Sequence, residues 1–171
     1  MNQETKQRIA ESFRGFHLPR YQEIPDVGLY LEQATKYIGG CLAPLGDTAL
    51  TSSMISNYVK KGLIPSPVKK QYSRDQLAYL LFIAVAKNVL SLDALADFIR
   101  LQQRTYDLLR AYDYFCQQFE WMLKFCFELT DTIEDLGADS TDEKRLLSTC
   151  VAAVVQKVYL EKCLAEIARE E

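Results

Sequence analysis

The fold is decided by residues 50–95, which read LTSSMISNYVKKGLIPSPVKKQYSRDQLAYLLFIAVAKNVLSLDAL. Residues 52–63 have the pattern of a short amphipathic helix, and Gly62 is placed to end it. Pro65 and Pro67 then disfavour helix and stiffen an extended basic segment, residues 64–74. Ser73-Arg-Asp-Gln76 has the spacing of a capping box that opens the next helix, whose apolar run over residues 77–86 predicts a buried, central position.

Further helices are expected on both sides of this stretch. We expect a helix over residues 2–14, an extended arm over 15–25, and a helix after Asp26 that Gly39-Gly40 ends. A loop over residues 41–48 then leads to the helix at residue 52. On the other side, Ser91 caps a helix that carries Leu92, Leu95, Phe98 and Ile99 on its apolar face.

The C-terminal part of the chain is expected to consist of two long helices. Apolar residues at spacings of four and three form a seam that ends before Gly137 and consists of Leu108, Tyr112, Phe115, Phe119, Met122, Cys126, Leu129, Ile133 and Leu136. Ser140-Thr-Asp-Glu143 resembles a capping box for a last helix, with Leu147, Val151, Val154, Val155, Val158, Leu164 and Ile167 on its inner face. The short connection between the two predicts an antiparallel hairpin.

The predicted fold is therefore all-α with a small two-stranded wing. It is a winged helix-turn-helix domain followed by a long antiparallel helical hairpin. Three regions are expected: an N-terminal helix and arm (1–25), the winged-helix domain (26–103), and the helical hairpin (104–171), which would serve dimerisation or effector binding.

Composition and charge limit the class of protein. Residues 1–90 carry eleven Lys and Arg against seven Asp and Glu, whereas residues 91–171 carry nine against sixteen. A basic front and an acidic back suit a nucleic-acid surface on one part of the molecule, although both could be solvated faces. Five cysteines without a CxxC motif, a polar N-terminus and apolar runs too short for a bilayer predict a cytoplasmic protein with no membrane partner.

The helix over residues 52–63 has the division of faces that a DNA-recognition helix needs. Ile55, Tyr58, Val59 and Gly62 fall on one side of a helical wheel. The opposite side is small, polar and basic, which would let it enter the major groove and contact bases and phosphates; it consists of Ser53, Ser56, Asn57 and Lys60, with Lys61 at the margin. Any surface helix has a polar face, so this pattern alone is weakly specific.

The basic segment that follows supplies candidate phosphate contacts. Lys69, Lys70, Tyr72 and Arg74 would hold the DNA backbone if the segment forms a hairpin beside the helix. The alternative is a solvated basic loop. Together these residues predict a transcriptional regulator that binds double-stranded DNA, and the alternative is a protein–protein interaction module that has kept the winged-helix scaffold and lost DNA binding.

The same residues resemble a known family, the MerR-type winged-helix proteins. The resemblance is carried by Asn57, Tyr58, Gly62, Leu63, Ile64, Tyr72, Ser73, Leu77, Ser91 and Leu92. The chain is more closely similar to an uncharacterised bacterial family with a MerR-like domain of unknown function. It departs from the MerR pattern at Ser56, where those proteins usually have an arginine that binds phosphate, in a shorter wing without glycine, and in a longer connection over residues 39–50.

Other chemistries find no support in the sequence. His17 is the single histidine, and no GxSxG, zinc-ligand, Walker A or GxGxxG pattern accompanies it, so we expect no enzyme, metal or cofactor. Asp131, Glu134, Asp135 and Asp139 cluster at a helix end and are expected to be solvated. The aromatic helix over residues 105–136 favours core packing, with a small-molecule effector pocket or a homodimer interface as alternatives; its aromatic residues include Tyr106, Tyr114, Trp121, Phe125 and Phe127.

Overall fold

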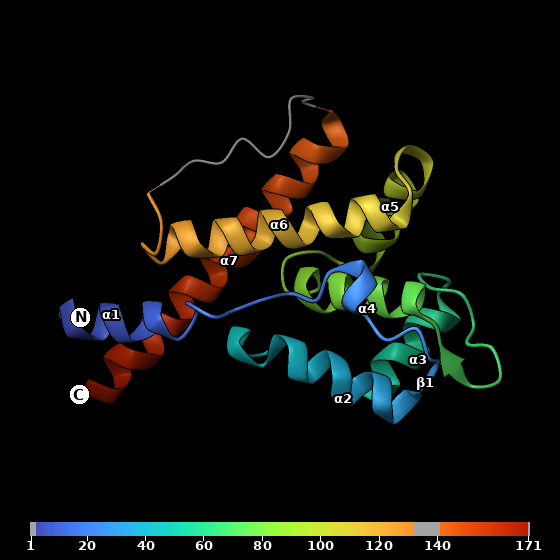
Figure 1. The fold of residues 1–171 in the computed structure, drawn as a ribbon, viewed down its shortest axis with the longest axis horizontal. Coiled ribbons are helices and arrows are strands. Elements are labelled where there is room, and N and C mark those ends of the chain that lie inside the picture. Colours follow the sequence, from blue (N-terminus) through green and yellow to red (C-terminus); the bar gives the residue numbers. More distant parts are fainter. Residues whose placement is uncertain (1–2, 132–140, 171) are drawn as a thin grey trace.

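The computed structural model describes residues 3–131 and 141–170, except the side chain of Glu170. This part of the chain is mostly helical and contains one small antiparallel sheet (Figure 1). Its helices are α1 (Gln3–Glu11), α2 (Leu31–Leu42), α3 (Ser52–Lys60), α4 (Arg74–Ala86), α5 (Leu92–Thr105), α6 (Leu108–Cys126) and α7 (Asp142–Glu170). The two strands are β1 (Leu29–Tyr30) and β2 (Gln71–Tyr72), and single 3₁₀ turns occur at Tyr21–Glu23 and Ala43–Leu45.

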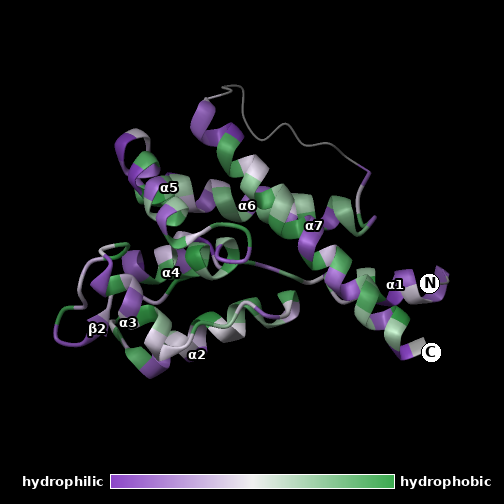
Figure 2. Ribbon diagram, turned by 180° about the vertical axis from the view of Figure 1, so that it is seen from behind, coloured by the Kyte–Doolittle hydropathy of each residue, from purple (hydrophilic) through white to green (hydrophobic). Residues whose placement is uncertain are grey.

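Helix α4 occupies the centre of the molecule, as its sequence predicts. Its capping box forms, because the Ser73 hydroxyl accepts from the Gln76 N–H and the Gln76 side chain accepts from the Ser73 N–H. Nearly every residue from Gln76 to Ala86 is buried. Figure 2 shows α4 between α2 on one side and α5 and α6 on the other. A helix without a polar face must be covered on all sides, and α4 is.

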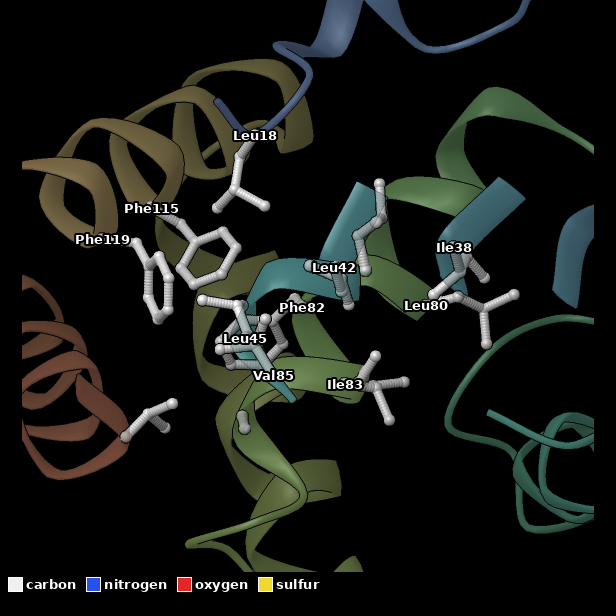
Figure 3. Close-up of a cluster of buried hydrophobic side chains, with 14 of the residues drawn as sticks. Leu18, Ile38, Leu42, Leu45, Leu80, Phe82, Ile83, Val85, Phe115 and Phe119 are labelled. Carbon is white, nitrogen blue, oxygen red and sulfur yellow. The ribbon is translucent and has the colours of Figure 1, made fainter. Parts of the chain in front are cut away.

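The core around α4 joins segments that are far apart in the sequence. Leu18 from the N-terminal arm, Leu42 from α2, Phe82 from α4, and Phe115 and Phe119 from α6 converge in one cluster (Figure 3). The rings of Phe82 and Phe115 meet edge to face with their centres 5.3 Å apart. The seam predicted on α6 is therefore used for packing within the chain.

Helix α2 continues past the point where the sequence predicts its end. Gly39 and Gly40 were expected to terminate it, but the helix runs on to Leu42. Leu42 and Ile38 are fully buried one turn apart, and their burial outweighs a penalty of about 1 kcal/mol for each glycine inside a helix. The predicted loop over residues 41–48 thus begins two residues later and includes a 3₁₀ turn.

Helix α6 ends earlier than its apolar seam predicts. Its last helical residue is Cys126, and Glu128 adopts a positive φ of 57°. The N–H of Leu129 donates to the Lys124 carbonyl and that of Glu128 to the Phe125 carbonyl, which is a Schellman motif built without glycine. The predicted helical continuation is thus wrong for residues 127–131. Ile133, Leu136 and the predicted stop at Gly137 lie outside the described residues.

The predicted antiparallel hairpin of the last two helices is also wrong. Three contacts show that the two segments run in the same direction, because later residues of one contact later residues of the other. The Tyr106 hydroxyl bonds that of Thr141, the Gln118 side chain bonds that of Ser148, and the ring of Phe127 packs on that of Tyr159. Helices α6 and α7 therefore run in the same general direction and cross (Figure 1). The end of α6 and the start of α7 consequently lie at opposite ends of the pair.

Helix α7 departs from its sequence-based description at both ends. The Thr141 hydroxyl accepts a hydrogen bond from the Lys144 N–H, so Thr141 caps the helix, while the predicted cap, Ser140, lies outside the described residues. Leu147, Val151, Val154, Val155 and Val158 are buried as predicted. Leu164 and Ile167 are predicted on the same inner face but are 55% and 38% exposed.

Candidate nucleic-acid interface

Helix α3 presents the predicted polar residues on one open surface. The Thr51 hydroxyl accepts from the Met54 N–H and fixes its start, and Gly62, with a φ of 73°, ends it in a Schellman motif. Ile55 and Tyr58 are buried, which sets the rotation of the helix. The predicted contact residues Ser53, Ser56, Asn57, Lys60 and Lys61 are all exposed as a result.

A tight hairpin over residues 68–71 carries the two predicted lysines at its tip. Val68 and Gln71 pair across it, and the Gln71 N–H donates to the Val68 carbonyl over 2.9 Å. Lys69 and Lys70 have φ values of 50° and 65°, as both central residues of a type I′ turn require. Such turns favour Asn and Gly, so two lysines in this conformation store strain at an exposed point.

The hairpin is attached to the helices through the small sheet. Strand β2 pairs with β1, with Leu29 opposite Tyr72 and Tyr30 opposite Gln71. Gly28 permits this approach, because a Cβ there would lie 2.7 Å from the Cβ of Gln71. Since β1 leads directly into α2, the hairpin, α3 and the start of α2 lie at one end of the molecule, and α2 runs from there toward the centre (Figure 1).

Tyr72 does not lie where the sequence analysis placed it. It was expected to contact the DNA backbone, but its side chain is buried, with 4% of its surface exposed. Its position on β2 opposite Leu29 turns the ring toward the core, and burial raises the pKa of its hydroxyl. Tyr72 therefore anchors the base of the hairpin.

Arg74 is likewise engaged within the protein. Its Nε donates to the Ile24 carbonyl over 2.9 Å and a terminal nitrogen donates to Gln22 Oε1 over 3.2 Å. The guanidinium also lies 5.5 Å from the centre of the Tyr21 ring and 3.8 Å from the Asp26 carboxylate. The predicted phosphate contact thus instead ties the N-terminal arm to the start of α4.

The surface beside the hairpin carries acidic as well as basic groups. A surface hollow of about 390 Å³ lies between the arm and the hairpin, and Lys69, Arg74, Asp26 and Asp75 all line it. The Tyr21 hydroxyl donates to Asp75, and this hydrogen bond raises the pKa of Tyr21 to about 12. Acidic and basic side chains are therefore mixed beside the arm, whereas residues 52–61 of α3 and its C-cap carry two lysines and no acidic residue.

A second polar cluster, absent from the sequence-based candidates, fixes the arm to α6. The nearly buried Glu120 carboxylate accepts two hydrogen bonds of 2.8 Å from the Arg20 guanidinium and one of 2.7 Å from the Leu18 N–H. The His17 ring lies within hydrogen-bonding distance of both this carboxylate and that of Glu23. Hydrogen bonds from the Arg20 backbone N–H and from His17 lower the pKa of Glu23. In the sequence, this cluster is indicated only by the position of the charged Glu120 between Phe119 and Trp121. That pattern does not show which residues pair with Glu120.

The structure also describes the other kinds of site considered from the sequence, which are an effector pocket, a metal site, a membrane span and an acidic cluster. The apolar cavity between α4, α5 and α6 measures about 60 Å³, and Phe82, Phe98 and Phe115 line it. Among residues 3–131 and 141–170, no group of three metal-ligating side chains comes together. In the same part of the chain, no helix combines the length and the apolar character that a membrane crossing requires. Asp131 is exposed, and Glu134, Asp135 and Asp139 lie outside the described residues.

Comparison with known proteins identifies the family. Residues 19–115 match the family model described as a domain of unknown function (DUF1836). The chain belongs to this family. The matched span begins within the arm, includes the hairpin and α2 to α5, and ends within α6. No curated protein and no solved structure shows a significant match.

This result corrects the resemblance drawn from the sequence. The family that matches is the DUF1836 family, and neither a MerR-type nor a winged-helix family is indicated. The resemblance to MerR-type proteins and to a MerR-like family is therefore wrong. Short shared elements such as Gly62-Leu63 and Tyr72-Ser73 reflect helix-ending and capping chemistry that unrelated helical proteins also use.

Proposed function

We propose that this protein binds double-stranded DNA through the exposed face of α3 and the hairpin at residues 68–71, and that it acts as a cytoplasmic transcriptional regulator. In this proposal α2, α3 and the hairpin are arranged as a winged helix-turn-helix. The observation that carries the proposal is the hairpin tip, where Lys69 and Lys70 are held in left-handed conformations at the same end of the molecule as α3, whose polar residues are exposed (Figure 1).

The two parts of this surface would make different contacts. The small side chains of Ser53 and Ser56 allow α3 to approach base edges closely, and Asn57 offers an amide that can pair with adenine. Lys60 and Lys61 lie at the end of α3, where they would meet phosphates at the groove edge. The Ser56 hydroxyl donates to the Ser52 carbonyl over 2.8 Å, so it would act as an acceptor.

The strained turn supports a role for the lysines beyond solvation. A solvated loop gains nothing from lysine at positions that favour glycine or asparagine, since each left-handed lysine costs about 1 kcal/mol. Positive charge at a protruding tip is useful when the tip meets a polyanion. Tyr72 and Arg74 are excluded from the proposed contacts because both are engaged within the protein.

The proposal is tested by fluorescence anisotropy with mixed-sequence 30-base-pair duplexes at low salt. The double variant Lys69→Glu/Lys70→Glu should bind at least about 30-fold more weakly than the wild type, because two phosphate contacts become repulsive. A second variant, Lys69→Asn/Lys70→Gly, keeps the turn but removes its charge, and it should reduce the dependence of log Kd on log salt by about two.

Lys6→Glu is the matched control. Lys6 is exposed on α1, at the opposite end of the molecule from α3 (Figure 1), so this charge change should leave binding nearly unaltered. Absence of duplex binding by the wild type, or equal losses in the Lys6 and hairpin variants, would refute the proposal.

A protein-binding module is the second candidate, and the acidic groups near the hairpin favour it. Asp26, whose side chain is 80% exposed, and Asp75 lie beside Lys69 and would repel a phosphate backbone that came close to the arm. Absence of duplex binding by the wild type, together with a pull-down that retrieves a protein partner but no DNA, would favour this candidate.

A further inference from the structure

Two cysteines line one pocket between α1, the end of α6 and α7, and the pocket has a volume of about 190 Å³. Cys126 is the last residue of α6 and is half-buried, whereas Cys163 on α7 is 8% exposed. Helix α1 closes the pocket from the side, because it lies along the C-terminal half of α7 (Figure 1). All five cysteines are free thiols, and this pocket brings together two that belong to different helices.

The packing of α6 on α7 holds these two thiols near each other. The ring of Phe127, the residue after Cys126, packs on that of Tyr159 with the ring centres 5.3 Å apart. Cys163 follows Tyr159 by four residues, so the two lie one turn apart on the same face of α7. Burial raises the pKa of the Cys126 thiol, and the charge of the nearby Cys163 raises it further.

Polar groups beside Cys163 can assist a reaction of its sulfur. The charge of Cys163 and a hydrogen bond with it raise the pKa of the Tyr159 hydroxyl, so this hydroxyl can donate to the sulfur. Lys6 on α1 lines the same pocket and brings a positive charge toward the thiols. A hydroxyl donor and an ammonium group favour nucleophilic attack, because the reacting form of cysteine is the thiolate.

The other three cysteines have no such surroundings. Cys116 and Cys150 are buried, and burial raises the pKa of these thiols to about 12 and about 11, which makes them unreactive. Burial also raises the pKa of Cys41. None of the three lines the pocket beside α1.

We propose that Cys126 and Cys163 form a redox-sensitive dithiol, which a hydroperoxide entering the pocket oxidises to a disulfide between α6 and α7. The sulfur of Cys163 attacks one oxygen of hydrogen peroxide and the O–O bond breaks. The leaving oxygen takes the thiol proton, which gives one water and a sulfenic acid on Cys163. The sulfur of Cys126 then attacks the Cys163 sulfur, so the S–S bond forms and the S–O bond breaks. The hydroxide leaves with the second thiol proton as water, and the peroxide has taken up two electrons.

Treatment of the folded full chain with equimolar hydrogen peroxide tests the proposal, with peptides mapped by mass spectrometry. The wild type should lose two hydrogen atoms and yield one peptide pair joined through Cys126 and Cys163. Cys126→Ser and Cys163→Ser should each abolish this product. Cys41→Ser, at a half-buried cysteine outside the pocket, is the matched control and should form the disulfide at the wild-type rate.

A change outside the thiols tests the role of the pocket. Ala10 lines it from α1, and Ala10→Leu should fill part of the space and slow the oxidation several-fold while both thiols stay in place. This difference should disappear in concentrated urea, because the unfolded chain has no pocket.

A wild type that forms no disulfide, or one that joins other cysteines, would overturn the dithiol, as would oxidation that stops at a sulfinic acid on Cys163. Equal rates for Ala10→Leu and the wild type would overturn entry through the pocket. The pocket and α3 lie at opposite ends of the molecule (Figure 1), so these outcomes are independent of DNA binding.

Discussion

The carboxylate of Glu120 holds the N-terminal arm in place. It is nearly buried and accepts hydrogen bonds from both the Arg20 guanidinium and the Leu18 N–H. Its removal would leave a partly buried cation and a buried backbone donor without an acceptor. Because Leu18 beside this cluster is part of the core, the effect should reach the packing around Phe115 and Phe119.

Glu120→Ala should therefore lower the free energy of unfolding by about 3 kcal/mol, measured by urea denaturation. Glu11→Ala provides the control, since Glu11 also pairs with an arginine, Arg14, but on the surface. An exposed pair of this type should contribute less than about 0.5 kcal/mol. Equal effects of the two substitutions would contradict the anchoring role of Glu120.

Individual side chains show which positions a local sequence pattern predicts correctly and which it does not. The lysines of the hairpin and the polar residues of α3 are exposed as their local spacing predicts. Tyr72 and Arg74 belong to the same basic segment, yet β1 covers the first and the arm engages the second. Those partners precede them by more than 40 residues, and local spacing carries no signal about them.

At the scale of elements, the two kinds of glycine in this chain have opposite roles. Gly40 lies inside α2, where an added methyl group would meet no neighbouring side chain within 4 Å, whereas Gly62 has a φ of 73° at the end of α3. Gly40→Ala should raise the free energy of unfolding by about 0.5–1 kcal/mol, because it reduces the freedom of the unfolded chain.

Gly62→Ala is the matched substitution and should have the reverse sign. Alanine at this left-handed position should lower the free energy of unfolding by about 1 kcal/mol. Both changes can be measured by urea denaturation in one series. A destabilising Gly40→Ala would show that α2 does not continue through this position in solution.

Helix starts were more predictable than helix ends. Ser73 and Ser91 cap the helices they were expected to cap, and Thr51 caps the helix expected near residue 52, because capping depends on one side chain and the three residues after it. The expected start at Asp26 is wrong, because Leu29 and Tyr30 pair as β1 and α2 begins at Leu31. The end of α6 depends on Glu128 adopting a conformation that usually favours glycine, and the end of α2 depends on the burial of Leu42. Both are set by tertiary packing.

At the scale of the whole molecule, buried thiols couple stability to alkaline pH. Burial raises the pKa of Cys116 to about 12 and that of Cys150 to about 11. In the unfolded chain a thiol titrates near 8.5. Protonation of both thiols thus stabilises the folded protein below about pH 8.5, and this contribution is lost as the pH rises toward the folded values.

The free energy of unfolding should fall by roughly 1.4 kcal/mol per pH unit for each of these thiols between about pH 9 and 10. Cys116→Ala should make this slope shallower by roughly 1.4 kcal/mol per pH unit, independently of its effect on the free energy of unfolding at pH 7. Val155→Ala, which also opens space in the core, should leave the slope unchanged. Identical slopes in the wild type and Cys116→Ala would contradict the assignment.

The overall arrangement of the C-terminal helices could not be obtained from their patterns. Periodicity identified the inner faces of α6 and α7 correctly over Tyr112–Phe119 and Leu147–Val158. The direction in which two such faces meet depends on the connection between them, and a short connection by itself favours a hairpin. The contacts from Tyr106–Thr141 to Phe127–Tyr159 show the parallel arrangement instead.

The contacts of α1 have a consequence for synthesis of the chain. Arg8 pairs with Glu166, and the Phe13 ring lies beneath Lys162 and against Phe127. On a ribosome, Arg8 emerges 158 residues before Glu166, the residue with which it pairs. The side of α1 that packs against α7 is therefore accessible to chaperones until α7 has been synthesised.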